Sequence, residues 1–335
     1  MSHRLTRRAL LLAAAAAFSD QTPARAHPPR SVARVGYVAT TLPLSDLTGF
    51  EPRDPAIREF LAALTALGWS DGKNVMTERR SAEGHFDRFG DILRDLVSRR
   101  CDVIVTTGTA MTEEALRVTT TVPIVATSVD LQRMETLVKS LARPGGNLTG
   151  MTGPGTQFEA KKFQVFKEAV PRARRIAVLE PRTTWDGWFG ESQRAAARAL
   201  GLTLIFAETR PNDYAAAFDV IVRARPDAIH VGPGIFMYAS RSLIIDFANR
   251  HRLPLMGQTG TFTEDGGLIS YATDFRHYTQ RAASYVDRIL RGARAGDLPI
   301  EQPSKFELVI NLQTARALGL MIPESLLVRA DRVIQ

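Results

Sequence analysis

The chain has 335 residues, of which 44% are hydrophobic, and this supplies enough apolar material for a sizeable core. Its formal net charge is +8, but the charged residues are dispersed and rarely interleaved with aromatic ones, which excludes the clustered basic face of a nucleic-acid-binding protein. The single cysteine, Cys101, excludes an intramolecular disulfide, and its place before the apolar run Val103-Ile104-Val105 indicates a small buried hydrophobe rather than a catalytic thiol.

Residues 1–26 have the features of an export signal. Three arginines lie ahead of an apolar run at 9–18, and Ala24-Arg25-Ala26 supplies a cleavage pattern of small residues. The run is too short to span a bilayer, so we predict a removed signal peptide rather than a membrane anchor. Arg7-Arg8 resembles a twin-arginine signal, although a general secretory signal explains the same residues. We therefore expect a mature protein outside the cytoplasm, most simply in a bacterial periplasm.

The first half of the chain alternates short apolar runs with amphipathic stretches. The runs predict buried strands, and apolar residues at helical spacing predict helices between them. In chain order the expected elements are a strand at 34–38, a helix at 54–67, a strand at 74–80, a helix at 86–100, a strand at 102–105, a helix ending at 118 and a strand at 123–126. This alternation is typical of a parallel α/β sheet.

The stretch Leu141–Gly150 (LARPGGNLTG) divides the chain. Pro144 and the two glycines after it end a helix, and residues 147–150 then have the pattern of a short strand. Because the same alternation of elements resumes afterwards, the stretch indicates a hinge between two lobes. An ordinary helix-to-strand turn is the competing interpretation.

The second half repeats the same types of element without a fixed sequence period. The expected elements are a helix at 158–169, a strand at 175–179, a helix at 191–200, a strand at 203–206, a helix at 214–223, a strand at 228–231, a helix at 240–251, strands at 254–257 and 266–271, and a helix at 278–290. We expect the last helix to return to the first lobe. The predicted organisation is therefore 31–148 plus 272–304 in lobe 1, and 149–271 plus 305–335 in lobe 2.

Ligands of parallel α/β sheets bind at the carboxyl ends of the strands, so the loops that follow the predicted strands are candidate ligand-binding segments. The candidate residues are Thr40, Thr41, Thr107, Gly108, Thr109, Ser128, Asp130, Thr184, Trp185, Gly234, Gln258 and Thr259. For any single Ser, Thr or Asp, helix capping is the simpler explanation. The convergence of the whole set favours a ligand cleft.

Three of these loops suggest specific contacts. Thr107–Thr109 combines hydroxyl groups with a glycine before a helix start, an arrangement that binds a carboxylate or another anion. Asp130 is the one acidic group so placed, and it suits an amino group. Trp185 either stacks on a flat ligand or covers the cleft wall.

The sequence contains no motif that indicates catalysis. It lacks a nucleophile elbow, a Walker loop and a dinucleotide-binding glycine motif, and its histidines are scattered rather than placed at metal-ligand spacing. We therefore predict no catalytic residues, no metal and no cofactor, which makes an exported α/β enzyme the weakest alternative.

Several segments resemble the tryptophan/tyrosine-type ABC transporter substrate-binding proteins. They are Leu67–Val75 (LGWSDGKNV), Ser140–Gly150 (SLARPGGNLTG), Tyr285–Gly292 (YVDRILRG), Asp297–Leu320 (DLPIEQPSKFELVINLQTARALGL) and the tail at 322–331. The resemblance covers essentially the whole mature chain. It implies a type I periplasmic-binding-protein fold, in which two doubly wound parallel-sheet lobes are joined by a three-crossing hinge and close on a ligand. Ser128-Val129-Asp130-Leu131 departs from the Gly-Asp-Pro-Val-type turn that the family often has there.

The expected function is that of a monomeric periplasmic receptor that binds a small molecule, such as an amino acid or a related carboxylate. Hinge closure would hold the ligand, and an ABC permease of the inner membrane would receive it. A periplasmic module that signals to a membrane receptor shares these features and stays an alternative. A repressor's effector domain shares the fold but would carry a helix-turn-helix in place of the export signal.

Overall fold

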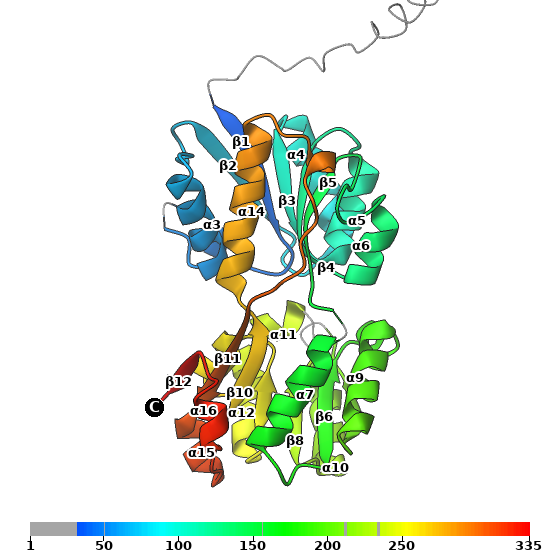
Figure 1. Ribbon diagram of the computed structural model, residues 1–335, viewed down its shortest axis with the longest axis vertical. Helices are drawn as coiled ribbons and strands as arrows, with labels where there is room; N and C mark the ends of the chain where they lie inside the picture. Colours follow the sequence, from blue (N-terminus) through cyan, green and yellow to red (C-terminus); the bar gives the residue numbers. More distant parts are fainter. Residues whose placement is uncertain (1–31, 50, 156, 211–212, 233–234) are drawn as a thin grey trace, which may run out of the picture.

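The computed structural model describes residues 32–49, 51–155, 157–210, 213–232 and 235–335. The predicted signal peptide and Gly234 lie outside these ranges. Within them, no helix combines the length and the apolar character that crossing a membrane requires. Figure 1 shows two lobes, one above the other, with narrow chain segments passing between them.

The first lobe is built on a five-stranded parallel sheet. Its strand order is β2-β1-β3-β4-β5, with β1 at Ala33–Ala39, β2 at Val75–Ser81, β3 at Val103–Thr107, β4 at Ile124–Val129 and β5 at Leu148–Thr152. Successive side chains of a strand point to opposite faces. Val35 and Tyr37 of β1 therefore enter one core, whereas Val38 enters another. Both faces of the sheet consequently need helices to cover them.

Helices α3 (Pro55–Ala66) and α14 (Phe275–Leu290) cover one face, and α4 (Phe89–Ser98), α5 (Thr109–Val118) and α6 (Leu131–Leu137) cover the other. Short elements complete the lobe: α2 (Leu44–Leu47), η2 (Phe86–Arg88) and η3 (Ala295–Asp297). Asp54 begins α3 by accepting a hydrogen bond from Ile57 N at 3.0 Å. Helix α6 is absent from the sequence prediction because its seven residues make only about two turns, too few for a clear period.

The second lobe contains a seven-stranded sheet of order β12-β11-β10-β9-β8-β6-β7. The strands are β6 (Arg175–Glu180), β7 (Thr203–Glu208), β8 (Ala228–Val231), β9 (Leu255–Gly257), β10 (Ile269–Thr273), β11 (Phe306–Asn311) and β12 (Arg332–Ile334). Only the β10–β11 pair is antiparallel among them.

Helices again cover both faces of this sheet. One face carries α7 (Gln157–Ala169), α9 (Trp188–Ala199), α15 (Leu312–Leu318) and α16 (Glu324–Leu327). The other carries α10 (Ala215–Ala224), α11 (Ile235–Ala239), α12 (Arg241–Arg250) and α13 (Gly260–Glu264). A short helix, α8 (Arg182–Trp185), follows β6.

The chain passes between the lobes three times: from β5 to α7, from β10 to α14, and from η3 to β11 (Figure 1). The crossings lie together. Thr152 N donates to Glu301 O at 2.9 Å, and Asp274 N donates to Lys305 O at 3.1 Å. Arg281 of α14 also pairs with the Glu301 carboxylate, with Nε 2.8 Å from Oε2. This architecture confirms the predicted type I periplasmic-binding-protein fold.

The stretch Leu141–Gly150 lies beside the crossings and is not itself one. Its end belongs to β5, so the chain leaves the first sheet after Thr152, and the predicted boundary at residue 148 falls at the start of that strand. Gly150 has φ +130°, and a Cβ there would meet the backbone of Ala126 in β4. This glycine therefore marks a close approach of two strands rather than a strand end. Similarly, β10 extends to Thr273, so the predicted boundary at residue 272, where the chain was expected to return to lobe 1, falls inside this strand.

Candidate functional site

The carboxyl ends of the parallel strands in both sheets face the crossings. β5 ends at the first crossing, and α7 starts there and runs away from it, so that β6 returns toward it (Figure 1). The loops that follow the parallel strands therefore meet between the lobes. The rings of Phe86 in the first lobe and Phe236 in the second have centroids 5.4 Å apart, so loops of the two edges are in contact.

The structure brings together the candidate residues that follow β3 and β4. Thr107 Oγ1 lies 3.2 Å from Thr127 Oγ1, and Gly108 N donates to Thr127 O at 2.9 Å. Asp130 N donates to Thr109 Oγ1 at 3.1 Å. Two loops that are separate in sequence thus form one connected polar surface.

Gly108 leaves the N-terminus of α5 accessible. It has φ +82°, and a Cβ there would meet no atom within 4 Å. Gly108 holds the N-cap position of this helix and has no side chain with which to make a capping hydrogen bond. The first N–H groups of α5 carry the positive end of the helix dipole, which is favourable for a carboxylate. The geometry is thus compatible with the predicted anion contact.

Asp130 caps α6. Its Oδ1 accepts a hydrogen bond from Arg133 N at 2.8 Å, which is the capping role weighed from the sequence. Within the described ranges, Oδ2 has no hydrogen bond, so one oxygen of the carboxylate remains for a ligand. Ser128 is exposed with φ +58°, where the register between β4 and β5 shifts.

Thr40 and Thr41 follow β1 at the same edge. Thr40 is buried, and its carbonyl oxygen accepts a hydrogen bond from Gly84 N at 2.8 Å, which ties this loop to the turn after β2. Thr41 is half-buried. The two threonines therefore border the edge, and their contact with a ligand stays a prediction.

Gln258 and Thr259 follow β9 in the second lobe. Gln258 Oε1 and Thr259 Oγ1 are both buried and have no hydrogen-bond partner in the described part of the chain. A buried polar atom left unpaired costs about 1–3 kcal/mol. Thr259 holds the N-cap position of α13, but its side chain makes no capping bond, so capping does not explain it. Neither oxygen is satisfied within the described part of the chain, which makes both candidates for a hydrogen bond to a ligand.

Trp185 packs within the second lobe. Its ring stacks on Phe206 of the edge strand β7, with centroids 4.8 Å apart, and the Arg194 guanidinium lies 4.7 Å from the ring centroid. These contacts match the wall-covering interpretation of this residue. Thr184, beside it, is half-buried. A ligand contact by Trp185 or Thr184 stays a prediction.

A buried polar cluster that the sequence analysis did not identify lies in the second lobe, at the carboxyl end of β6. Glu180, the last residue of β6, is fully buried; its Oε2 accepts from Gln193 Nε2 at 3.1 Å, and its Oε1 is unpartnered among the described residues. Glu159 and Lys162 of α7 form a buried ion pair at 3.0 Å. One feature of the sequence could have indicated this cluster: the apolar run of β6 (RIAVLE) ends in a glutamate. Glutamate is rarely buried without a partner.

This cluster has perturbed acid–base properties. Burial raises the pKa of Glu180 to about 7, an effect that the hydrogen bond from Gln193 opposes. His230 of β8 is also fully buried, with its ring 5.1 Å from that of Phe163 in α7, and burial together with the nearby Lys162 charge holds its pKa well below the usual value. Both shifts arise because a buried site disfavours the charged form of each group.

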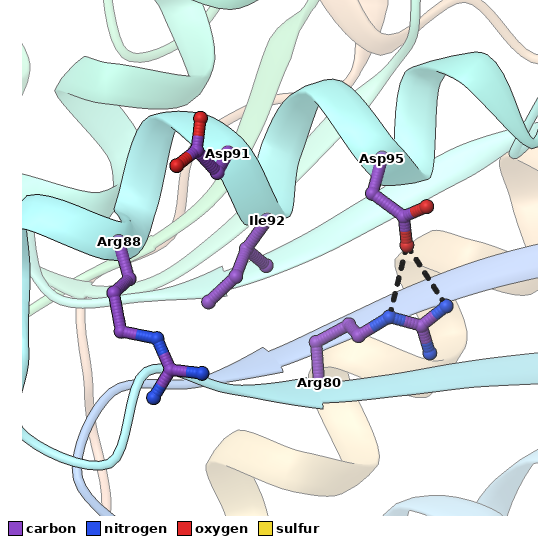
Figure 2. Close-up of a pocket in the computed structure, with 5 residues that line it drawn as sticks. All are labelled: Arg80, Arg88, Asp91, Ile92 and Asp95. Carbon is purple, nitrogen blue, oxygen red and sulfur yellow. Dashed lines mark hydrogen bonds and ion pairs between the residues drawn. The ribbon is translucent and has the colours of Figure 1, made fainter.

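Figure 2 shows a pocket at the outer edge of the first sheet, between β2 and α4. Arg80, Arg88, Asp91, Ile92 and Asp95 line it. Arg80 donates from Nε and Nη2 to Asp95 Oδ2 at 3.1 and 3.0 Å, so these two charges of the pocket balance each other. It contains none of the candidate residues. Across the described ranges, no group of three or more His, Cys, Asp and Glu side chains is arranged to hold a metal ion.

Comparison with known proteins shows which family has this arrangement. The model of the ABC transporter substrate binding protein family matches residues 51–334. The chain belongs to this family. It is 24% identical over 279 residues to the tyrosine-binding protein of Clostridioides difficile (strain R20291), and the match covers 83% of this chain and 80% of that protein. Family membership confirms the resemblance found in the sequence.

Solved structures of similar fold agree with this assignment. A conserved domain protein from Vibrio cholerae has a TM-score of 0.80 and 27% identity, covering 90% of this chain and 99% of that one. An ABC domain from Streptococcus pneumonia in complex with L-Trp has a TM-score of 0.78 and 24% identity, covering 91% of this chain and all of that one. Both share the two-lobed architecture over nearly their whole length.

Proposed function

We propose that this protein is an extracytoplasmic receptor that binds an aromatic amino acid, tyrosine or tryptophan, between its lobes and delivers it to an ABC permease. The names of two similar proteins support the ligand class, since one is a tyrosine-binding protein and the other was solved with L-Trp. The observation that carries the proposal is that loops at the carboxyl ends of the strands carry polar groups in both lobes: a helix N-terminus without a side-chain N-cap in the first, and unpartnered buried oxygens in the second. We propose that it acts as a monomer, without catalysis, after removal of residues 1–26.

The geometry suggests how such a ligand would lie. Its carboxylate would meet the Thr107–Thr109 loop at the start of α5, and its ammonium group would meet Asp130 Oδ2. Gln258 Oε1 and Thr259 Oγ1 would accept from the phenol O–H of tyrosine or the indole N–H of tryptophan. Trp185, whose ring stacks on Phe206 and lies beside Arg194, would cover the cleft wall.

Closure would couple these contacts to transport. A ligand that touches both lobes binds the closed arrangement better than the open one, and it therefore shifts the population toward closure. The permease would then recognise the closed form. Ligand-dependent uptake in vesicles that contain the cognate permease supports this role, whereas capture by a sensory receptor with no uptake contradicts it.

Calorimetry with Thr109→Ala and Asp130→Ala tests the proposed contacts. Each variant should weaken binding of tyrosine or tryptophan by about tenfold, because each loses a hydrogen bond to a charged group. Thr65→Ala, which alters an exposed threonine of α3 away from the strand ends, is the matched control. Unchanged affinity in both site variants would remove these roles.

A further inference from the structure

We infer that Phe86 and Phe236 form an aromatic latch that holds the lobes closed and sets ligand affinity without contacting the ligand. The inference rests on the proposed closure of the two lobes around a ligand. It starts from the 5.4 Å separation of the two ring centroids, since Phe86 belongs to η2 of the first lobe and Phe236 to α11 of the second.

The first lobe holds Phe86 on a well-supported turn. Gly84, with φ +87°, donates from N to Thr40 O at 2.8 Å, and the Glu83 carboxylate accepts from Leu44 N at 3.0 Å. The ring of buried Phe89 lies 5.1 Å from that of Phe86. Phe86 is nevertheless 49% exposed, so its position is not explained by burial in the core of its own lobe.

The second lobe presents Phe236 to this turn. A Cβ on Gly84 would lie 3.4 Å from Phe236 Cε1, so the glycine leaves the ring just enough room to approach. The next residue, Met237, is fully buried in the core of the second lobe and anchors α11. Each ring is thus fixed to its own lobe, and the contact joins the two lobes.

The latch lies far from the hinge. The crossings cluster beside β5, whereas Phe86 follows β2, at the opposite edge of the five-stranded sheet. Four strand spacings separate these edges by about 19 Å. A hinge rotation of about 10° at that distance moves the rings apart by about 3 Å, which breaks the contact. Opening the cleft therefore requires the latch to separate.

The size of the effect follows from the strength of aromatic pairs. Such a pair favours the state that contains it by about two- to tenfold. Loss of the latch should lower the ratio of closed to open protein by this factor. Ligand affinity should fall by up to the same factor, mainly through faster dissociation.

The test measures the distance between the lobes without any ligand. Ser98→Cys in α4 and Ser242→Cys in α12 place spin labels at exposed positions in different lobes. Cys101 is buried, and burial raises the pKa of its thiol to about 11, so it resists labelling. Pulsed electron spin resonance then compares this labelled protein with versions that carry Phe86→Ala, Phe236→Ala or both.

Each single substitution should move part of the population to longer distances, and the double variant should show no further change, because both remove one interaction. Phe86→Tyr keeps the ring and should retain the original distribution. Phe218→Ala is the matched control, because Phe218 stacks on Phe247 at 3.9 Å entirely within the second lobe. Unchanged distances in both single variants, or an equal shift in the control, would overturn the latch.

A ligand arm separates this inference from the proposed function. If tyrosine binds the original protein, Phe86→Ala should raise its dissociation rate about two- to tenfold with little change in association. Loss of binding with unchanged distances would instead make Phe86 a ligand contact and overturn the latch. If neither tyrosine nor tryptophan binds, the proposed ligand is wrong, and the distance measurement still decides whether the latch exists.

Discussion

The buried ion pair of α7 gives a quantitative test of the second lobe. Lys162 is 5% exposed and Glu159 is 1% exposed, and their charged atoms are 3.0 Å apart. Glu159 Oε2 has no further partner in the described ranges. Lys162→Met keeps a linear side chain of similar length but leaves the Glu159 carboxylate buried without its counter-charge.

Removing one member of a buried pair costs about 3–5 kcal/mol of unfolding free energy. For a unit of this size, 1 kcal/mol lowers Tm by about 2–4 °C, so Lys162→Met should lower Tm by about 6–20 °C. The double variant Glu159→Gln, Lys162→Met removes both charges and should recover most of that loss, since the desolvation penalty disappears with them.

Thermal unfolding followed by circular dichroism, together with urea titration, measures both variants. Arg94→Met, which removes half of an exposed pair with Asp91 on α4, is the matched control and should change the unfolding free energy by less than about 1 kcal/mol. A loss below about 1 kcal/mol in Lys162→Met, or a double variant no more stable than the single one, would refute the reasoning.

Three further substitutions have defined outcomes. Because the pKa of Glu180 is raised to about 7 in the folded protein, the stability that this carboxyl contributes is present below about pH 4.5 and is lost as the pH rises through about 7. Between pH 5 and pH 8, Glu180→Gln should therefore gain unfolding free energy relative to the original protein, as measured by urea titration. A difference in unfolding free energy between the two proteins that is the same at both pH values would be inconsistent with this. Gly150→Ala places a Cβ against the backbone of Ala126 and should lower the unfolding free energy by more than about 2 kcal/mol. Gly146 has φ +72° and open space around it, so Gly146→Ala should cost only about 1–2 kcal/mol. Similar melting temperatures for the two variants would argue against the close approach of Gly150 to Ala126. Gln258→Leu removes a hydrogen-bond acceptor and should weaken tyrosine binding by about tenfold in calorimetry, with little effect on the binding of phenylalanine. Equal losses of affinity for both ligands would exclude a hydrogen bond between Gln258 and the phenol.

The alternation of strands and helices was predictable from the sequence because each element carries a strong local pattern. Ile57, Phe60 and Leu64 recur at helical spacing and are buried in α3, and the apolar run that became β3 contributes to both faces of its sheet. Local patterns do not predict the bounds of an element where tertiary contacts determine them. The extension of β5 past Gly150 depends on its approach to Ala126, which no local propensity contains.

The candidate site was predictable as a set of loops but not in its details. The topological rule correctly brought Thr107–Thr109 and Asp130 together, because their strands are neighbours. The buried Glu180 is paired with Gln193 of the helix that follows its strand, 13 positions further along the chain, and the contact between Phe86 and Phe236 joins residues 150 positions apart. Such pairings arise from packing and have no signature in a single sequence.

The most direct test of the account is isothermal titration calorimetry of residues 27–335 with L-tyrosine and L-tryptophan, supported by thermal shift. We predict saturable 1:1 binding of at least one of them, weaker binding of phenylalanine, and stabilisation of about 2.7 kcal/mol at a hundred times the dissociation constant. Absence of both heat and thermal shift with either amino acid, in a protein that unfolds cooperatively, would contradict the central claim that this cleft binds an aromatic amino acid.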